Sequence, residues 1–203
     1  MTLAKIIPLS FVMIAGPQIL SAIFLATSED WRGNSAALVA GAAVSITAIV
    51  TLAFFLSDGA SKQGASGNAL DIIFMVLLVA AGVHTFLTRK TSKPPKWMGK
   101  LEEEKPKGAF KLGFLLLGVF PTDILTSFAV GGSVAAHHDS WFGVLPFVLL
   151  TLLFLALPSL CVLLLGEKAK KALPKVRDWM NNNSWIVSEC VIGLFVVITA
   201  SSL

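Results

Sequence analysis

Charged residues and tyrosine are scarce in this sequence. Asp, Glu, Lys and Arg make up 14% of its 203 residues, there is no Tyr, and the mean hydropathy is +0.80. Soluble domains carry about 25% charged residues. The deficit therefore excludes an ordinary water-soluble domain. The only two cysteines, Cys161 and Cys190, lie in apolar runs and form no CxxC pair, which argues against a disulfide framework.

Sequence motifs for catalysis and for cofactor binding are also missing. We find no phosphate-binding glycine loop, no P-loop and no nucleophile motif, so we expect neither an enzyme nor a cofactor. His137, His138 and Asp139 stand together, but adjacent ligands on a short loop are a poor sign of a metal site, and we expect no metal. The basic clusters at 89–111 and 168–177 could suggest nucleic-acid binding, but there is no soluble fold to carry such a patch.

What the sequence does contain is a series of long apolar runs. Each is long enough to cross a bilayer, which takes about 20 residues, and each should be helical because unpaired backbone groups are costly in lipid. The predicted fold class is an all-α polytopic membrane protein with transmembrane segments at 6–27, 36–56, 70–87, 110–130, 142–165 and 185–203. The first run could be read as a signal peptide. Its length and the polar residues within it favour a retained helix instead.

The basic residues indicate an orientation. Fourteen of the sixteen Lys and Arg residues fall in the segments after the first, third and fifth predicted helices, and only Lys5 and Lys62 fall on the other side. The positive-inside rule then places the fourteen in the cytoplasm and both termini outside, in a plasma-membrane protein. The basic stretches at 88–107 and 167–183, the second with Leu173, Val176 and Trp179 at helical spacing, are predicted to anchor on membrane lipid.

Two halves of the chain resemble each other. Pro17 lies in GPQILSAIF and Pro121 in FPTDILTSF, and several landmarks follow each proline in the same order. Apolar helices align easily, so no single match is compelling. Three helices per half would give the halves opposite orientations, as in the inverted repeats of secondary transporters. We expect one repeat at 1–87, a cytoplasmic linker at 88–109 and a second repeat at 110–203.

The candidate site follows from the paired prolines. Proline inside a helix removes a backbone hydrogen bond, and paired breaks at equivalent positions point to a transporter site, although a packing kink is the alternative. The predicted substrate-binding or coupling residues are Pro17, Gln18, Ser21, Pro121, Thr122, Asp123 and Thr126.

Asp123 is the most informative of these residues, because a carboxylate within a membrane segment is costly. We expect it to face the interior within reach of Gln18 or Ser21 and to couple transport to protons, unless it is a structural acid. Asp71, His84 and Glu189 are left open.

The sequence resembles a known family. Six helices in two inverted halves with Pro in the first and fourth resemble the lysine-exporter superfamily. Within it, PKWMGKLEEEKPKGAFKLG followed by FPTD looks like the GAP family, which is related to the mycobacterial sulfolipid-addressing protein. That family often has Asn-Pro where Phe120-Pro121 stands here. A similarly shaped thiol-disulfide transporter places Cys beside both prolines, and this chain has none there.

The resemblance implies export or surface delivery of glycolipids or other small polar molecules. Our leading hypothesis is a secondary exporter of a small polar molecule or glycolipid, with its site between the first and fourth helices. The paired proline breaks, with Asp123 beside one of them, motivate it. The alternative is a non-transporting accessory or scaffold protein for lipid delivery. Neither the substrate, the coupling ion nor a homo-oligomeric state follows from the sequence.

Overall fold

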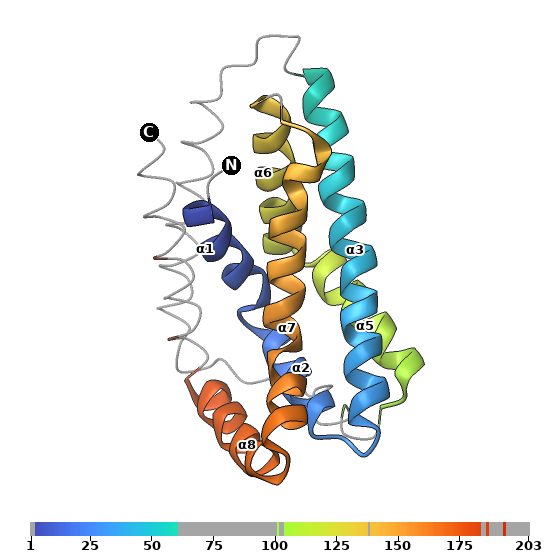
Figure 1. Ribbon diagram of the computed structural model, residues 1–203, viewed down its shortest axis with the longest axis vertical. Helices are drawn as coiled ribbons and strands as arrows, with labels where there is room; N and C mark the ends of the chain where they lie inside the picture. The colour runs from blue at the N-terminus through green and yellow to red at the C-terminus, as the bar shows by residue number, and fades with distance from the viewer. Residues whose placement is uncertain are drawn as a thin grey trace.

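The structure is a computed structural model that describes residues 3–60, 101, 104–137, 139–183, 186 and 193 (Figure 1). This part of the chain is helical and contains no strand, which confirms the all-α class. The expected third helix at 70–87 lies outside the described residues, as does nearly all of the sixth at 185–203. Six spans and an inverted repeat therefore stay predictions.

Two of the expected spans are broken helices. The first consists of α1 (Leu3–Ile14) and α2 (Pro17–Ala26), which are bent by 67°. The other consists of α5 (Pro106–Val119) and α6 (Pro121–Ala136), also bent by 67°. In Figure 1, α2 runs toward the end of the molecule where α8 lies, whereas α5 and α6 run away from it. The two broken helices are thus antiparallel.

The other long helices are continuous. They are α3 (Trp31–Ala60) and α7 (Leu145–Leu165), the latter preceded by the 3-10 helix η3 (Trp141–Val144). Their apolar stretches of 27 and 25 residues exceed the roughly 20 needed to cross a membrane. Counting each bent pair as one span, the described residues hold up to four spans. The chain is a helical membrane protein.

Helix ends extend beyond the apolar runs wherever polar groups can start or stop a helix. The helix α3 begins before residue 36 because the Asp30 side chain accepts a hydrogen bond from the N–H of Gly33 at 3.2 Å. Likewise, α5 begins before residue 110, with Pro106 at its first position, where a missing N–H has no cost. Gly166 has φ 55° and ends α7.

Helix α3 packs along both parts of the second broken helix, and α7 packs along both parts of the first. The contact between α3 and α5 brings their backbones close together. A Cβ added at Gly41 would collide with the carbonyl oxygen of Phe110, and one at Gly113 would collide with that of Leu38. Small residues allow this close approach, as is common between membrane helices.

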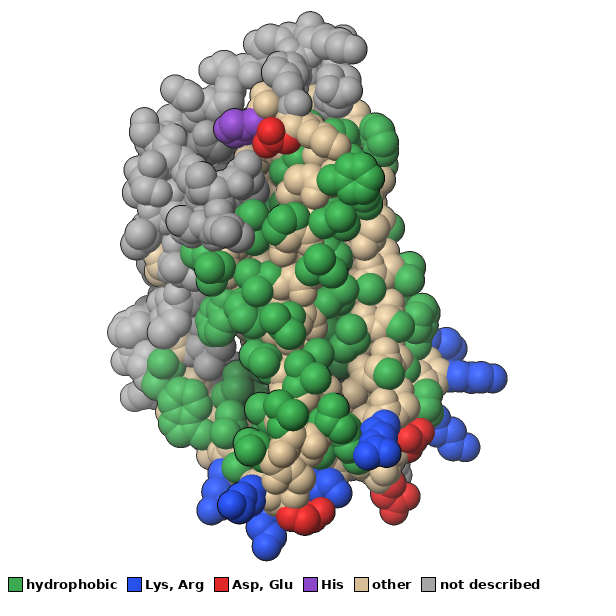
Figure 2. Space-filling view, viewed as in Figure 1, with side chains coloured by type: hydrophobic (Ala, Val, Ile, Leu, Met, Phe, Trp, Pro, Cys, Tyr) green, Lys and Arg blue, Asp and Glu red, His purple; other side chains and the backbone are tan. Residues whose placement is uncertain are grey.

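The apolar surface is arranged as lipid requires. One face of α3 is buried against α5 and α6, and the opposite face exposes large side chains such as Leu52 at 55% and Phe55 at 63%. Figure 2 shows hydrophobic side chains along the height of the molecule, with Lys and Arg gathered at the end formed by α8 and the starts of α3 and α5. An apolar belt this large marks a surface that faces lipid.

The expected basic helix is α8 (Glu167–Asn182). Its apolar residues split between two environments: Leu173 packs against a small cluster with Ala26, whereas Trp179 is 54% exposed. The guanidinium of Arg177 lies 4.4 Å from the centre of the Phe24 ring, so α8 is tied to α2. This position suits a helix that lies at the membrane surface.

Candidate functional site

The first break depends on a glycine as well as a proline. Helix α1 ends at Ile14, and Gly16 takes φ 113° and ψ −138°, a conformation that residues with a side chain rarely adopt. Pro17 then opens α2, and the N–H of Leu20 reaches back to the Gly16 carbonyl at 3.4 Å. The chain thus changes direction within the candidate span and restarts a helix whose first N–H groups have no helical partner.

The second break needs only one residue of ordinary conformation. Phe120 has φ −65° and ψ 127°, the extended region that a following proline imposes. Its carbonyl accepts hydrogen bonds from the N–H groups of Asp123 at 3.1 Å and Ile124 at 3.0 Å, which start α6. Pro121 occupies the first position of that helix.

The two breaks meet through a pair of side chains. Gln18 Nε2 donates a hydrogen bond to Asp123 Oδ2 at 2.6 Å, across 105 residues of sequence. Gln18 is 2% exposed and Asp123 1%. Thr122 Oγ1 lies 3.4 Å from the other carboxyl oxygen. Asp123 therefore faces the protein interior, as expected, and Gln18 is its main partner.

The start of a helix is also a favourable place for the acid. Asp123 stands in the first turn of α6, where the aligned peptide dipoles stabilise negative charge. Gln18 lies in the first turn of α2, so the start of a second half-helix lies one hydrogen bond away. This arrangement of two half-helix starts can hold a polar or ionic group that lipid alone would exclude.

The hydroxyl residues near the breaks serve their own helices. Ser21 Oγ donates to the carbonyl of Pro17 at 2.7 Å, and Thr126 Oγ1 donates to that of Thr122 at 2.7 Å. Each hydroxyl thus adds a hydrogen bond to the carbonyl four residues before it in its own helix. Ser21 is fully buried beside the break, but its hydroxyl donates to the Pro17 carbonyl and not to Asp123.

Two buried polar atoms near the pair lack a hydrogen-bond partner within the part of the chain that the structure describes. They are Gln18 Oε1 and Ser127 Oγ, both enclosed by the surrounding helices. Buried polar atoms without a hydrogen bond are costly and call for an explanation, such as a bound water, ion or ligand group. The site thus has unused hydrogen-bonding capacity on both broken helices.

Other sequence candidates lie elsewhere. His137 Nδ1 lies 2.7 Å from the Ser133 carbonyl at the opposite end of α6 from Asp123. Among the described residues no group of three His, Cys, Asp or Glu side chains could hold a metal. Asp71, His84 and Glu189 lie outside the described residues.

Sequence reasoning missed one feature of the site and one polar contact elsewhere in the core. One is Gly16, whose signal was available: a glycine directly before a mid-span proline indicates an unusual backbone conformation. The other is the Phe147 carbonyl, which accepts from Thr151 Oγ1 at 2.8 Å on α7 and from Ser10 Oγ at 3.4 Å on α1. The hydrogen bond from Ser10 to this carbonyl forms only because α1 packs on α7.

Comparison with known proteins identifies one family. A family model described as Sap, sulfolipid-1-addressing protein, matches residues 6–202 and so includes both breaks. The match confirms the suspected relationship with sulfolipid-addressing proteins. No curated protein and no solved structure matches the chain.

Proposed function

The chain belongs to the family of Sap, sulfolipid-1-addressing protein, and we propose that it is a secondary transporter that exports a lipid or a small polar molecule. One observation carries this proposal: the buried hydrogen bond of 2.6 Å between Gln18 and Asp123 joins the two half-helix starts. A membrane-buried acid paired with one amide is an expensive arrangement for packing alone. The transport reaction involves no covalent step.

The chemistry of the pair suits proton coupling. An ionised Asp123 accepts a hydrogen bond from the Gln18 amide nitrogen, as the structure has it. A protonated Asp123 would donate to the Gln18 amide oxygen after the amide turns over, because an amide has both donors and an acceptor. A hydrogen bond between Gln18 and Asp123 can then form in either protonation state. The acid can gain and lose a proton while the helices stay folded.

The helix contacts support an inverted repeat, whose two halves would move relative to each other during transport. In this proposal a rotation of about 180° about an axis in the membrane plane exchanges the halves. It would exchange the packing of α3 on α5 and α6 with that of α7 on α1 and α2. It would also exchange the contact of α1 with α6 for that of α5 with α2, and all of these contacts occur. The pair is closed to solvent, so export requires the halves to separate on one side at a time.

We propose that the protein lies in the plasma membrane. Its basic end then faces the cytoplasm and both termini lie outside. Single cysteines test this in a background in which Cys161 and Cys190 are replaced by Ser. An impermeant thiol reagent applied to intact cells should label His137→Cys and not Lys175→Cys. Labelling of Lys175→Cys from outside would overturn the orientation.

The coupling role is tested by Asp123→Asn, which keeps the shape of the side chain but cannot ionise. Transport of co-purified lipids into proteoliposomes should lose its dependence on pH, while expression and melting temperature stay close to those of the wild type. The matched control is Glu167→Gln, which removes an acid from an exposed ion pair on α8. Wild-type transport with unchanged pH dependence in Asp123→Asn would refute the coupling role.

The second candidate is a non-transporting accessory protein for lipid delivery. Its supporting observation is the closed centre, with Gln18 and Asp123 exposed by only 1–2% and α3 packed tightly on α5. Mass spectrometry of co-purified molecules, followed by transport assays with each, separates the candidates. A reconstituted wild type that moves none of its co-purified lipids would favour the accessory role.

A further inference from the structure

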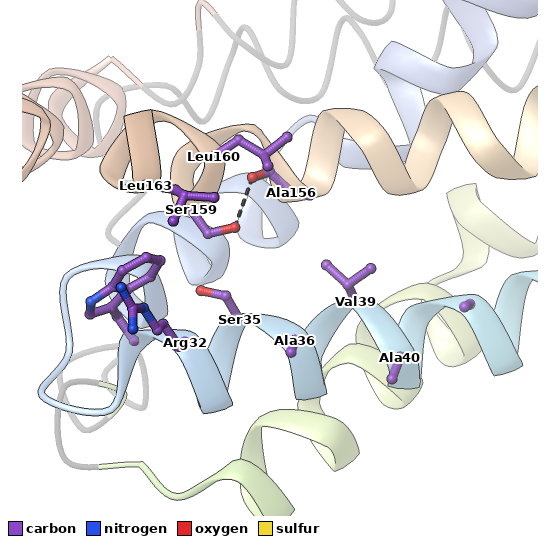
Figure 3. Close-up of a pocket in the computed structure, with 11 residues that line it drawn as sticks. Arg32, Ser35, Ala36, Val39, Ala40, Ala156, Ser159, Leu160 and Leu163 are labelled. Carbon is purple, nitrogen blue, oxygen red and sulfur yellow. Dashed lines mark hydrogen bonds between the residues drawn. The ribbon is translucent and has the colours of Figure 1, made fainter. Parts of the chain in front are cut away.

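A second feature lies away from the Gln18–Asp123 pair, on the flank between α3 and α7. It is a groove of about 580 Å³ (Figure 3). This volume falls within the range of about 300–1,000 Å³ that is typical of small-molecule sites. Its walls are apolar: small residues of α3 form one side and Leu160 and Leu163 of α7 the other.

The depth of the groove comes from the small side chains. Ala36, Ala40 and Ala43 lie on one face of α3 at helical spacing, and Val39 lies between them. Together they form a smooth channel that runs along the helix axis, which in a spanning helix is the direction of the acyl chains. The groove could thus hold a hydrocarbon chain parallel to its neighbours in the bilayer.

The end of the groove at the start of α3 is polar and basic. Arg32 is exposed there, and its guanidinium lies 5.2 Å from the centre of the Trp31 ring. This is also the end of the molecule where Lys and Arg gather (Figure 2). A guanidinium at this basic end of the molecule can bind a phosphate oxygen of a lipid headgroup.

A buried hydroxyl provides the second, independent observation. Ser35 is 7% exposed and lines the groove, and its Oγ has no hydrogen-bond partner among the described residues. Figure 3 shows Ser35 and Ser159 projecting into the space between the two helices. Ser159 is satisfied, because its Oγ donates to the Ala156 carbonyl at 2.8 Å. The unpaired Ser35 hydroxyl therefore indicates that a bound molecule places a polar group about one helical turn along α3 from Arg32.

We propose that the α3–α7 groove binds one anionic phospholipid of the surrounding bilayer. Its phosphate lies at Arg32, its glycerol or ester oxygen accepts a hydrogen bond from Ser35, and one acyl chain lies along Ala36 and Ala40. This inference does not depend on transport: the site is separate from the Gln18–Asp123 pair, and it is detected as lipid binding.

The test is native mass spectrometry of the full chain in mild detergent, with phosphatidylglycerol, phosphatidylcholine or inorganic phosphate added. The wild type should retain one phosphatidylglycerol in preference to phosphatidylcholine. Arg32→Gln removes the charged contact and Ala40→Leu fills the channel. Arg32→Gln should weaken phosphatidylglycerol binding by about tenfold, the loss expected for one good charged contact. Ala40→Leu should also weaken it, because the larger side chain takes the space of the acyl chain.

Two matched controls guard against general effects. Lys111→Gln removes a positive charge from α5 outside the groove, and Ala129→Leu enlarges an exposed alanine of α6. Both should bind phosphatidylglycerol like the wild type. Ala36→Leu serves as a second channel-filling variant if Ala40→Leu fails to fold.

Three outcomes would overturn the proposal. Equal retention of both lipids, insensitive to Arg32→Gln, would mean ordinary annular lipid. Binding of inorganic phosphate as strong as that of the lipid would mean a free-anion site. A dimer in the wild type that Ala40→Leu dissociates, without loss of lipid, would mean that a second copy of the chain occupies the groove.

Discussion

The two proline breaks bend their helices by the same 67°, but they do so by different means. The first places Gly16 in a conformation with φ 113°, whereas the second needs only Phe120 in ordinary extended geometry. The first break contributes the neutral Gln18 to the central hydrogen bond and the second contributes the acidic Asp123.

The difference shows that the unusual backbone conformation and the acidic side chain lie at different breaks. The break with the unusual backbone carries the neutral partner, and the break with the relaxed backbone carries the acid. If the halves are equivalent in shape, their roles should be exchangeable by changing side chains alone. If the backbones differ in mobility, the exchange should fail.

The largest effect is expected from moving the acid. Asp123→Asn alone should abolish the proton-dependent part of export, because no group of the pair can ionise. The double variant Gln18→Glu with Asp123→Asn keeps both chain lengths and places the acid on the other broken helix. We expect it to regain proton-dependent export, measured in proteoliposomes across a range of pH.

The single variant Gln18→Glu is the control for this exchange. It places two carboxyl groups at hydrogen-bond distance, where they cannot both ionise easily. Its pH dependence should therefore differ from that of the double variant. A double variant as inactive as Asp123→Asn would show that the two breaks are not interchangeable.

A smaller effect, on stability, is expected at Gly16. Gly16→Ala should cost about 1–3 kcal/mol, because a side chain at this φ is strained. An added Cβ would lie 3.4 Å from Gln18 Oε1, an ordinary contact, so strain alone causes the loss. The measurement is the melting temperature in detergent.

The matched change at the second break is Phe120→Leu. Phe120 is 39% exposed and has an ordinary conformation. A change at such a partly exposed position should stay near about 0.5 kcal/mol. Equal melting temperatures for Gly16→Ala and the wild type would remove the contrast between the breaks.

A third contrast between the breaks is expected from the prolines themselves. Pro17→Ala leaves Gly16 in place, so the first break should persist. Pro121→Ala removes the constraint that holds Phe120 extended, so α5 and α6 should straighten. Pro17→Ala should alter stability by no more than about 1 kcal/mol.

Spin-label distances measure this last contrast. Labels at Leu115 and Ala129, both exposed, span the second break, and labels at Ile7 and Thr27 span the first. The distance across the second break should lengthen in Pro121→Ala, and the distance across the first should stay constant in Pro17→Ala. The reverse result would assign the second break to tertiary packing and the first to proline.

Much of the fold follows from local signals in the sequence. The apolar runs predicted α3 and α7, and the prolines predicted where the other two spans are interrupted. Helix starts were less predictable, because Asp30 and Pro106 extend α3 and α5 outside the apolar runs. The roles of Gln18 and Asp123 in transport stay a prediction, although the structure brings the two residues together.

The sequence by itself determined that this protein lies in a membrane rather than in water, and it determined where two of the helices break. Both are local properties: a run of apolar residues must avoid water, and proline lacks an N–H wherever it stands. The tertiary structure alone decided that Gln18 rather than Ser21 meets Asp123, and that α3 and α7 leave a groove with Ser35 in its wall. These features join residues far apart in the chain, and their positions depend on how closely packed helices fit together, which no local pattern specifies.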